Sequence, residues 1–252
     1  MWVVSDPTPQ PYRETWELQQ RLWAQRWTGA IPDTLLLLEH RPVVTLGKNA
    51  RRENLLLPEA LFRARGVEVV EVDRGGDVTY HGPGQLIGYW IFDLRDHRPD
   101  VHWFLRAIEE TLIRALARFG VNAGRDPSAT GVWVEGRKVA AMGLHLSHWV
   151  STHGFALNIT TDLTPFSWIV PCGLPGRGVT SMERLGARTR DRAEVEREIE
   201  ATAAELFARA PERVEPPALR DVLMALEGRG APGSGAAAGS APRGMRSHEC
   251  PV

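Results

Sequence analysis

Two periods of hydrophobic and polar positions alternate along the chain and predict a mixture of helices and strands. Residues 12–27 carry apolar side chains at spacings of three and four, which predicts an amphipathic helix. Trp16, Trp23 and Trp27 share one stripe of it, and we expect this stripe to pack on a sheet. Asp100 caps a second long helix, which Gly120 ends. Further helices are expected at 58–65, 191–210 and 217–226.

Runs of apolar or alternating residues predict the strands. Residues 34–38 are expected to form a buried strand, 43–46 a shorter strand between Pro42 and Gly47, and 67–72 a half-exposed strand. Residues 131–158 form a predicted meander of antiparallel strands joined by short turns. One face of this meander carries small side chains, which suits either a bound ligand or a closely packed helix: Ala140, Ala141, Gly143, Gly154 and Ala156. Helices around a mixed, largely antiparallel sheet predict an α+β fold.

A glycine-rich loop leads into a strand-like run over residues 74–94. Glycines at 75, 76, 82 and 84 surround Arg74, Thr79, Tyr80 and His81. Glycine lets the backbone approach a ligand closely, so the loop is predicted to form one wall of a binding site. For His81, pocket lining and a structural hydrogen bond fit equally well. The loop lacks the G-x-x-x-x-G-K-[ST] pattern, and residues 173–178 do not fit G-x-G-x-x-G, so no ATP or NAD site is indicated.

Composition narrows the class of protein mainly by exclusion. The 252 residues carry 30 basic and 31 acidic side chains, and no basic excess indicates nucleic-acid binding. No signal peptide or membrane-length apolar run is visible, and two cysteines do not make a disulfide framework. We therefore expect a cytoplasmic protein. A monomer is expected because no exposed apolar stripe is visible in the sequence. Low-complexity sequence begins at residue 228, which predicts one domain over 1–227 and a disordered tail over 228–252.

Two residues are candidates for covalent chemistry. Cys172 lies between a proline and a glycine, outside any predicted element, where a thiol can serve as a nucleophile if a cation raises its thiolate fraction. Lys138 begins a run of small and apolar residues, and burial there would favour its neutral amine. A lysine that reaches water from a strand end is the competing interpretation.

No metal or cofactor is predicted. His145 and His148 are separated by an odd number of residues, so they would face opposite sides of one strand, and His153 lies beyond the following turn. No second cysteine lies near Cys172 to complete a zinc site.

Taken together, three segments resemble the lipoyl(octanoyl) transferase family of lipoate biosynthesis. They are R-G-G-D-V-T-Y-H-G-P-G-Q at 74–85, G-R-K-V-A-A-M-G-L-H with H-G-F-A-L-N within 136–158, and P-C-G-L with V-T-S-M within 171–182. The resemblance implies a fold similar to the catalytic domain of biotin and lipoate protein ligases. It also implies octanoyl transfer from octanoyl-acyl carrier protein to a lysine of lipoyl domains, those of 2-oxoacid dehydrogenase E2 subunits and of the glycine cleavage H protein.

The resemblance assigns roles to single residues. Cys172 would be the nucleophile that forms a thioester, and Lys138 its partner, either as an ammonium or as a neutral base. The segments that match acyl-substrate binding comprise Arg74, Gly75, Gly76, Asp77, Val78, Thr79, Tyr80, His81, Ala141, Met142, Gly143, Gly154, Phe155 and Ala156. Competing interpretations are an ATP-dependent lipoate or biotin ligase of the same fold, and a non-catalytic module that binds an acyl group or a partner.

Overall fold

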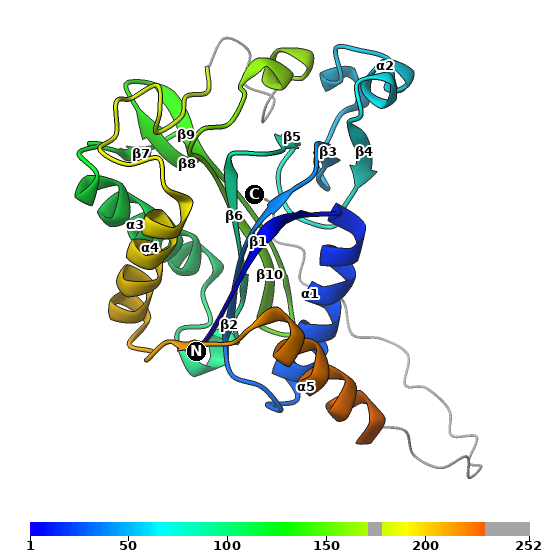
Figure 1. Ribbon diagram of the computed structural model, residues 1–252, viewed down its shortest axis with the longest axis vertical. Helices are drawn as coiled ribbons and strands as arrows, with labels where there is room; N and C mark the ends of the chain where they lie inside the picture. Colours follow the sequence, from blue (N-terminus) through cyan, green and yellow to red (C-terminus); the bar gives the residue numbers. More distant parts are fainter. Residues whose placement is uncertain (171–177, 230–252) are drawn as a thin grey trace.

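The structure, a computed structural model, describes residues 1–170 and 178–229 (Figure 1). Its helices are α1 (Tyr12–Trp27), α2 (Glu59–Ala64), α3 (Val101–Arg118), α4 (Arg192–Phe207) and α5 (Pro216–Arg229), with 3-10 turns η1 (Arg52–Asn54), η2 (Leu94–Asp96) and η3 (Thr164–Trp168). Its strands are β1 (Trp2–Gln10), β2 (Thr34–His40), β3 (Val43–Leu46), β4 (Glu68–Glu71), β5 (Val78–His81), β6 (Gln85–Ile91), β7 (Gly124–Asp126), β8 (Ala129–Val134), β9 (Arg137–Ser147), β10 (Val150–Asn158) and β11 (Glu212–Arg213).

A large mixed sheet separates two layers of helices. Its strand order is β11-β1-β2-β6-β10-β9-β8-β7, with β1 parallel to β2 and β11 and the other pairs antiparallel. Helices α3 and α4 cover one face, and α1 and α5 cover the other (Figure 1). A smaller sheet has the order β4-β3-β5. The predicted α+β fold, the long helices and the meander are confirmed.

The face of α1 that packs on the sheet differs from the predicted one. Trp27 is 44% exposed, and Trp16 and Trp23 are half-buried. The buried stripe of α1 consists of Tyr12, Thr15, Gln19, Leu22 and Arg26. Polar side chains can occupy it because they find partners: Gln19 Oε1 accepts from the backbone N–H of His153 at 2.8 Å. The prediction is therefore wrong for Trp27, whereas Trp16 and Trp23 are partly buried and pack against core clusters at the edge of the buried stripe. The helix itself is confirmed.

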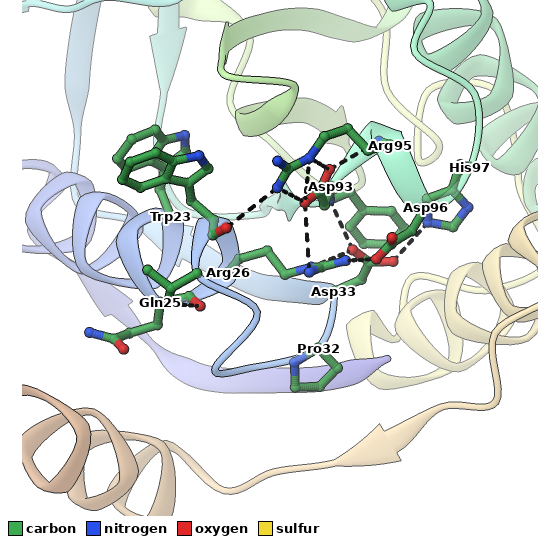
Figure 2. Close-up of polar contacts among 12 residues, drawn as sticks. Trp23, Gln25, Arg26, Pro32, Asp33, Asp93, Arg95, Asp96 and His97 are labelled. Atoms are coloured by element: carbon green, nitrogen blue, oxygen red, sulfur yellow. Dashed lines mark hydrogen bonds and ion pairs between the residues drawn. The ribbon is translucent and has the colours of Figure 1, made fainter.

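A buried charged network ties α1 to the start of β2 and to η2 (Figure 2). Arg26 Nε donates to Asp33 Oδ1 at 2.9 Å, and its Nη2 pairs with Asp96. Asp33 also accepts from His97 Nε2 at 2.7 Å and from the N–H of Asp93 at 3.0 Å. Burial alone would raise the pKa of Asp33, but these hydrogen bonds lower it below its usual value. The carboxylate of Asp33 is thus fully engaged in holding the elements together.

The ends of the chain depart from the predicted pattern in two places. Strand β1 was not predicted, because Pro7 and Pro9 argue against a strand; its register shifts between Ser5 and Pro9, which accommodates the prolines. Helix α5 includes Gly228 and Arg229, which the sequence assigned to the tail. The rest of the predicted disordered tail, 230–252, lies outside the described residues. Among the described helices, none has the length and apolarity needed to cross a membrane.

Candidate active site

The glycine-rich segment is partly a strand. Residues 78–81 form β5, which pairs antiparallel with β3, and all four side chains are buried. The prediction that Thr79, Tyr80 and His81 decorate a loop is therefore wrong. The glycine-rich loop is therefore shorter and ends at residue 77, before β5. Backbone hydrogen bonds hold it in place: the N–H of Lys48 donates to Arg74 O at 2.9 Å, and the N–H of Gly75 donates to Leu144 O at 2.8 Å.

The side chain of Arg74 braces this loop from inside. Its Nη2 donates to Thr45 O at 2.9 Å and to Thr45 Oγ1 at 2.8 Å, and its Nη1 donates to Gly75 O at 3.0 Å. Arg74 is only 7% exposed. Asp77 supports the outer side of the loop, where its Oδ2 accepts from Asn54 Nδ2 at 2.6 Å. The polar side chains of the segment therefore fix the path of its backbone.

Two glycines of the meander allow close backbone contacts: Gly143 lets the glycine-rich loop approach β9, and Gly154 lets β6 approach β10. Gly143 on β9 lies opposite Gly154 on β10. A Cβ atom on Gly143 would lie 2.8 Å from Gly75 O and 3.2 Å from Arg74 Cδ. A Cβ atom on Gly154 would lie 2.1 Å from Gly88 O. At Gly143, the space above the sheet is occupied by the glycine-rich loop, and not by a helix or a ligand cavity.

Only some of the predicted substrate-binding residues come together. Arg74, Thr79 and His81 all lie around Thr45, and Gly75 lies against Gly143. Gly76 lies instead against Gly47 and accepts from the N–H of Asn49 at 3.1 Å. Side chains alternate along a strand, so their neighbours point the other way. Val78 and Tyr80 pack into the core beneath the small sheet, Met142 and Phe155 into the core beneath α3 and α4, and Ala156, which lies opposite Ala141, into the core beside α1.

Asp73 and His153 form a contact that the sequence did not indicate. Asp73 Oδ1 accepts from His153 Nε2 at 2.8 Å, and Asp73 Oδ2 lies 3.7 Å from His145 Nε2. Burial lowers the pKa of His153, and the hydrogen bond and charge of Asp73 only partly offset this effect. From the sequence, His145 and His153 were candidates only for a metal site. Within 1–170 and 178–229, no group of three or more His, Cys, Asp or Glu side chains is arranged to hold a metal. The pair instead anchors the residue before Arg74 to the residue before Gly154.

A buried chain of hydrogen bonds runs from His81 to the backbone of Lys138. His81 Nδ1 donates to Gln85 Oε1 at 2.8 Å, and Gln85 Nε2 donates to Asn158 Oδ1 at 2.9 Å. Asn158 Nδ2 donates to Thr180 O at 3.0 Å, and the N–H of Thr180 donates to Lys138 O at 2.9 Å. Burial holds the pKa of His81 well below its usual value, so its ring is neutral near pH 7. Of the two interpretations of His81, the structure favours a structural hydrogen bond.

Lys138 is buried at the start of β9. It is 8% exposed, and its Nζ lies 4.8 Å from the centre of the Trp133 ring. Gly131 makes room for it, because a Cβ atom there would lie 3.2 Å from Lys138 Cε. A lysine that reaches out into water does not fit this burial. The N–H of Lys138 donates to Gly178 O at 3.0 Å, which places the strand against the segment that follows Cys172 in the chain. Cys172 itself lies outside the described residues.

Comparison with known proteins identifies the family to which the chain is similar. The family described as the lipoyl protein ligase A/B catalytic domain matches residues 11–204. The octanoyltransferase of Solibacter usitatus is 53% identical over 70% of this chain and 80% of its own length. That of Rubrobacter xylanophilus is 53% identical over 75% of this chain and 86% of its own length.

A solved structure shares the fold at low sequence identity. It is a bipartite lipoate protein ligase from Thermoplasma acidophilum, studied with its E2 lipoyl domain. The two structures superpose with a TM-score of 0.66 at 14% identity, covering 89% of this chain and 90% of the other. The fold similar to lipoate protein ligases is thereby confirmed. With the family match and the close curated relatives, the chain belongs to the lipoyl protein ligase A/B catalytic domain family and, within it, to the octanoyltransferases, a group of acyltransferase enzymes.

Proposed function

We propose that the protein transfers an octanoyl group from octanoyl-acyl carrier protein to the lysine of a lipoyl domain through a thioester on Cys172, in the cytoplasm. The acceptors would be the lipoyl domains of 2-oxoacid dehydrogenase E2 subunits and of the glycine cleavage H protein. The observation that carries the proposal is the position of Lys138, buried beside residues 178–180 and hydrogen-bonded through them to the glycine-rich segment.

The first step forms the acyl-enzyme. The Cys172 thiolate attacks the donor's thioester carbonyl, a C–S bond to Cys172 forms, and the carrier thiolate leaves and takes a proton. Because one thioester replaces another, the step is nearly balanced in energy and needs no ATP.

The second step makes the product. The neutral amine of the acceptor lysine attacks the octanoyl-Cys172 carbonyl, an amide bond forms, and the Cys172 thiolate leaves while the amine loses a proton. Lys138 could stabilise the thiolate as an ammonium, or take protons from the thiol and the amine as a neutral base. Backbone N–H groups near Cys172 or Gly143 are candidates to stabilise the oxyanion.

Intact-mass measurement tests the acyl-enzyme. Wild type and Cys172→Ala would be incubated with octanoyl-acyl carrier protein without ATP, with Cys250→Ala as the matched control because it removes the other cysteine. We expect one octanoyl mass on wild type and on Cys250→Ala, and none on Cys172→Ala. An octanoyl mass that persists on Cys172→Ala, or that requires ATP, contradicts the proposal; the ATP requirement would point to a ligase.

The role of Lys138 is tested by comparing two substitutions. Lys138→Met keeps much of the side-chain volume and removes the nitrogen, so both accounts predict a large loss of octanoyl loading. Lys138→Arg keeps a cation that cannot act as a base near neutral pH. Loading that survives in Lys138→Arg supports the ammonium account. Full loading in Lys138→Met would show that Lys138 does not take part in the reaction.

A further inference from the structure

One edge of the segment at residues 178–180 is open. Lys138 donates its N–H to Gly178 O at 3.0 Å and accepts at its O from the N–H of Thr180 at 2.9 Å, which is a parallel bridge to Val179. In this pattern the N–H and C=O of Val179 point away from β9. Among the described residues, neither group has a hydrogen-bond partner. Within the described part of the chain, Val179 therefore offers a donor and an acceptor on an extended segment next to Lys138.

This open edge borders a pocket of about 290 Å³. Leu163 and Phe166 supply apolar walls, Thr164 and Ser167 supply hydroxyl groups, and Arg184 supplies a cation. The Ser167 hydroxyl donates to Thr164 O at 2.7 Å, so its oxygen can still accept a hydrogen bond. The pocket thus combines apolar, hydrogen-bonding and positively charged surfaces, which suits a long ligand with an anionic end.

Two arginines near Gly178 have no hydrogen-bond or ion-pair partner among residues 1–170 and 178–229. Arg184 is exposed, and its side chain makes no hydrogen bond or ion pair with any described residue. Hydrogen bonds from Thr164 lower the pKa of Asp162, and the charge of Arg184 adds a smaller contribution. Arg137 is likewise exposed and without a described partner, and its Cγ would lie 3.7 Å from a Cβ atom on Gly178. Of the two neighbouring glutamates, Glu183 pairs with Arg190 at 3.0 Å and Glu135 lies in the turn before Arg137. The mouth of the pocket keeps two guanidinium groups available for an anion.

We propose that this surface binds the phosphopantetheine arm through which a carrier protein presents its thioester, an inference that rests on the proposed function. The arm is an extended chain with two amide groups and a phosphate at the end remote from sulfur. An amide of the arm pairs with the N–H and C=O of Val179 as an added strand would, and its methyl groups contact Leu163 and Phe166. The phosphate binds between Arg137 and Arg184. Because the same segment pairs with Lys138, an arm on this edge delivers its thioester towards the reacting residues.

Two donors that differ only in the phosphate test the proposal. Octanoyl-4′-phosphopantetheine and octanoyl-pantetheine would each be used to load the full-length protein, and the measured quantity is the ratio of their kcat/KM values. We expect wild type to favour the phosphorylated donor by about tenfold, the size of one charge-assisted contact. The ratio should fall towards one in Arg137→Gln/Arg184→Gln. It should stay at its wild-type value in Arg220→Gln, which alters an exposed arginine on α5 away from the pocket.

The outcomes separate this inference from the proposed function. A ratio near one in wild type, or an unchanged ratio in the double variant, overturns the arm site while octanoyl loading still supports the acyl-enzyme. If the double variant keeps the ratio but slows transfer from preloaded enzyme to a lipoyl domain, the arginines bind the acceptor, and the inference is also overturned. No loading of wild type by either donor, nor by octanoyl-acyl carrier protein, removes the acyl-enzyme and this inference together.

Discussion

Gly143→Ala provides a sharp test of how the glycine-rich loop is held. The added Cβ atom would lie 2.8 Å from Gly75 O and 3.2 Å from Arg74 Cδ. Neither neighbour can move easily: the N–H of Gly75 is bonded to Leu144 O at 2.8 Å, and Arg74 is bonded to Thr45 through Nη2 at 2.8 Å. The substitution must therefore push the loop away from β9 by a few tenths of an ångström or strain the hydrogen bonds that hold it.

The expected cost follows from two opposing effects. Forcing a methyl group into a closely packed contact typically costs about 1–3 kcal/mol. Replacing glycine by alanine restricts the unfolded chain and returns about 0.4–1 kcal/mol where the backbone conformation suits alanine. We expect Gly143→Ala to lower the free energy of unfolding by roughly 1–2 kcal/mol, because the contact term is the larger. The melting temperature should fall by about 2–4 °C for each kcal/mol in a protein of this size.

Urea unfolding of Gly143→Ala and Gly124→Ala measures the contact alone. Gly124 lies on β7 of the same sheet, and a Cβ atom there would meet nothing within 4 Å. We expect Gly124→Ala to unfold at the same or a slightly higher urea concentration than wild type. If both variants unfold at the same concentration with the same slope, Gly143 is not needed for the close approach of loop and sheet, and the packing argument fails.

Three further predictions concern buried charges. Burial lowers the pKa of His40 to about 4, so between the unfolded value of 6.5 and about 4 the unfolded state binds a proton that the folded state does not. Stability should therefore fall by up to about 3 kcal/mol as the pH drops through this window, and His40→Gln should flatten that loss in urea unfolding measured at several pH values. In Asp73→Asn, removal of the carboxylate that raises the His153 pKa should make His153 titrate at still lower pH by NMR, whereas an unchanged or higher value would contradict the ion pair. Asp33→Ala deprives the buried Arg26 of a 2.9 Å partner and should cost about 3 kcal/mol in thermal or urea unfolding; a near-neutral effect would show that Asp96 and Asp93 suffice.

The sequence predicted the helices well where the hydrophobic periodicity agrees with residues that cap or end a helix. Helix α1 has the predicted bounds, and α3 lies between Asp100 and Gly120 as expected, with Asp100 Oδ1 accepting from the N–H of Trp103 at 3.0 Å. The prediction failed where partners far away in the chain decide the outcome. Nothing near Gln19 indicates that a backbone N–H on β10 will bond it, so hydrophobicity alone predicted Trp27 to be buried and did not predict that Gln19 is.

For the candidate site, the sequence indicated which residues matter more readily than what each of them contacts. The glycines at 75, 76, 143 and 154 were singled out, but which of them meet a ligand and which meet backbone depends on strand pairing across the fold. Nothing in the sequence indicated that Asp73 would pair with His153, because an aspartate before an arginine is common on any protein surface. Strand alternation, once β5 and β9 are known, separates Val78, Tyr80 and Met142 from the residues around Thr45.

The hydrogen-bond chain gives a physical reason why the three matching segments occur together. Gln85 ends the first segment, Asn158 ends the second, and Thr180 lies in the third. These residues bond one another in that order, at 2.9 Å and 3.0 Å, and all three are buried. A buried polar group left without a partner costs about 1–3 kcal/mol. Replacing Gln85 removes the donor to Asn158 Oδ1, and replacing Asn158 removes the donor to Thr180 O, whereas Thr180 takes part through its backbone carbonyl. The segments are therefore coupled through their polar ends, and the coupling fixes the register of Thr180 on Lys138. Buried polar residues thus set where Lys138 lies relative to residues 178–180, the segment that follows the proposed nucleophile Cys172 in the chain.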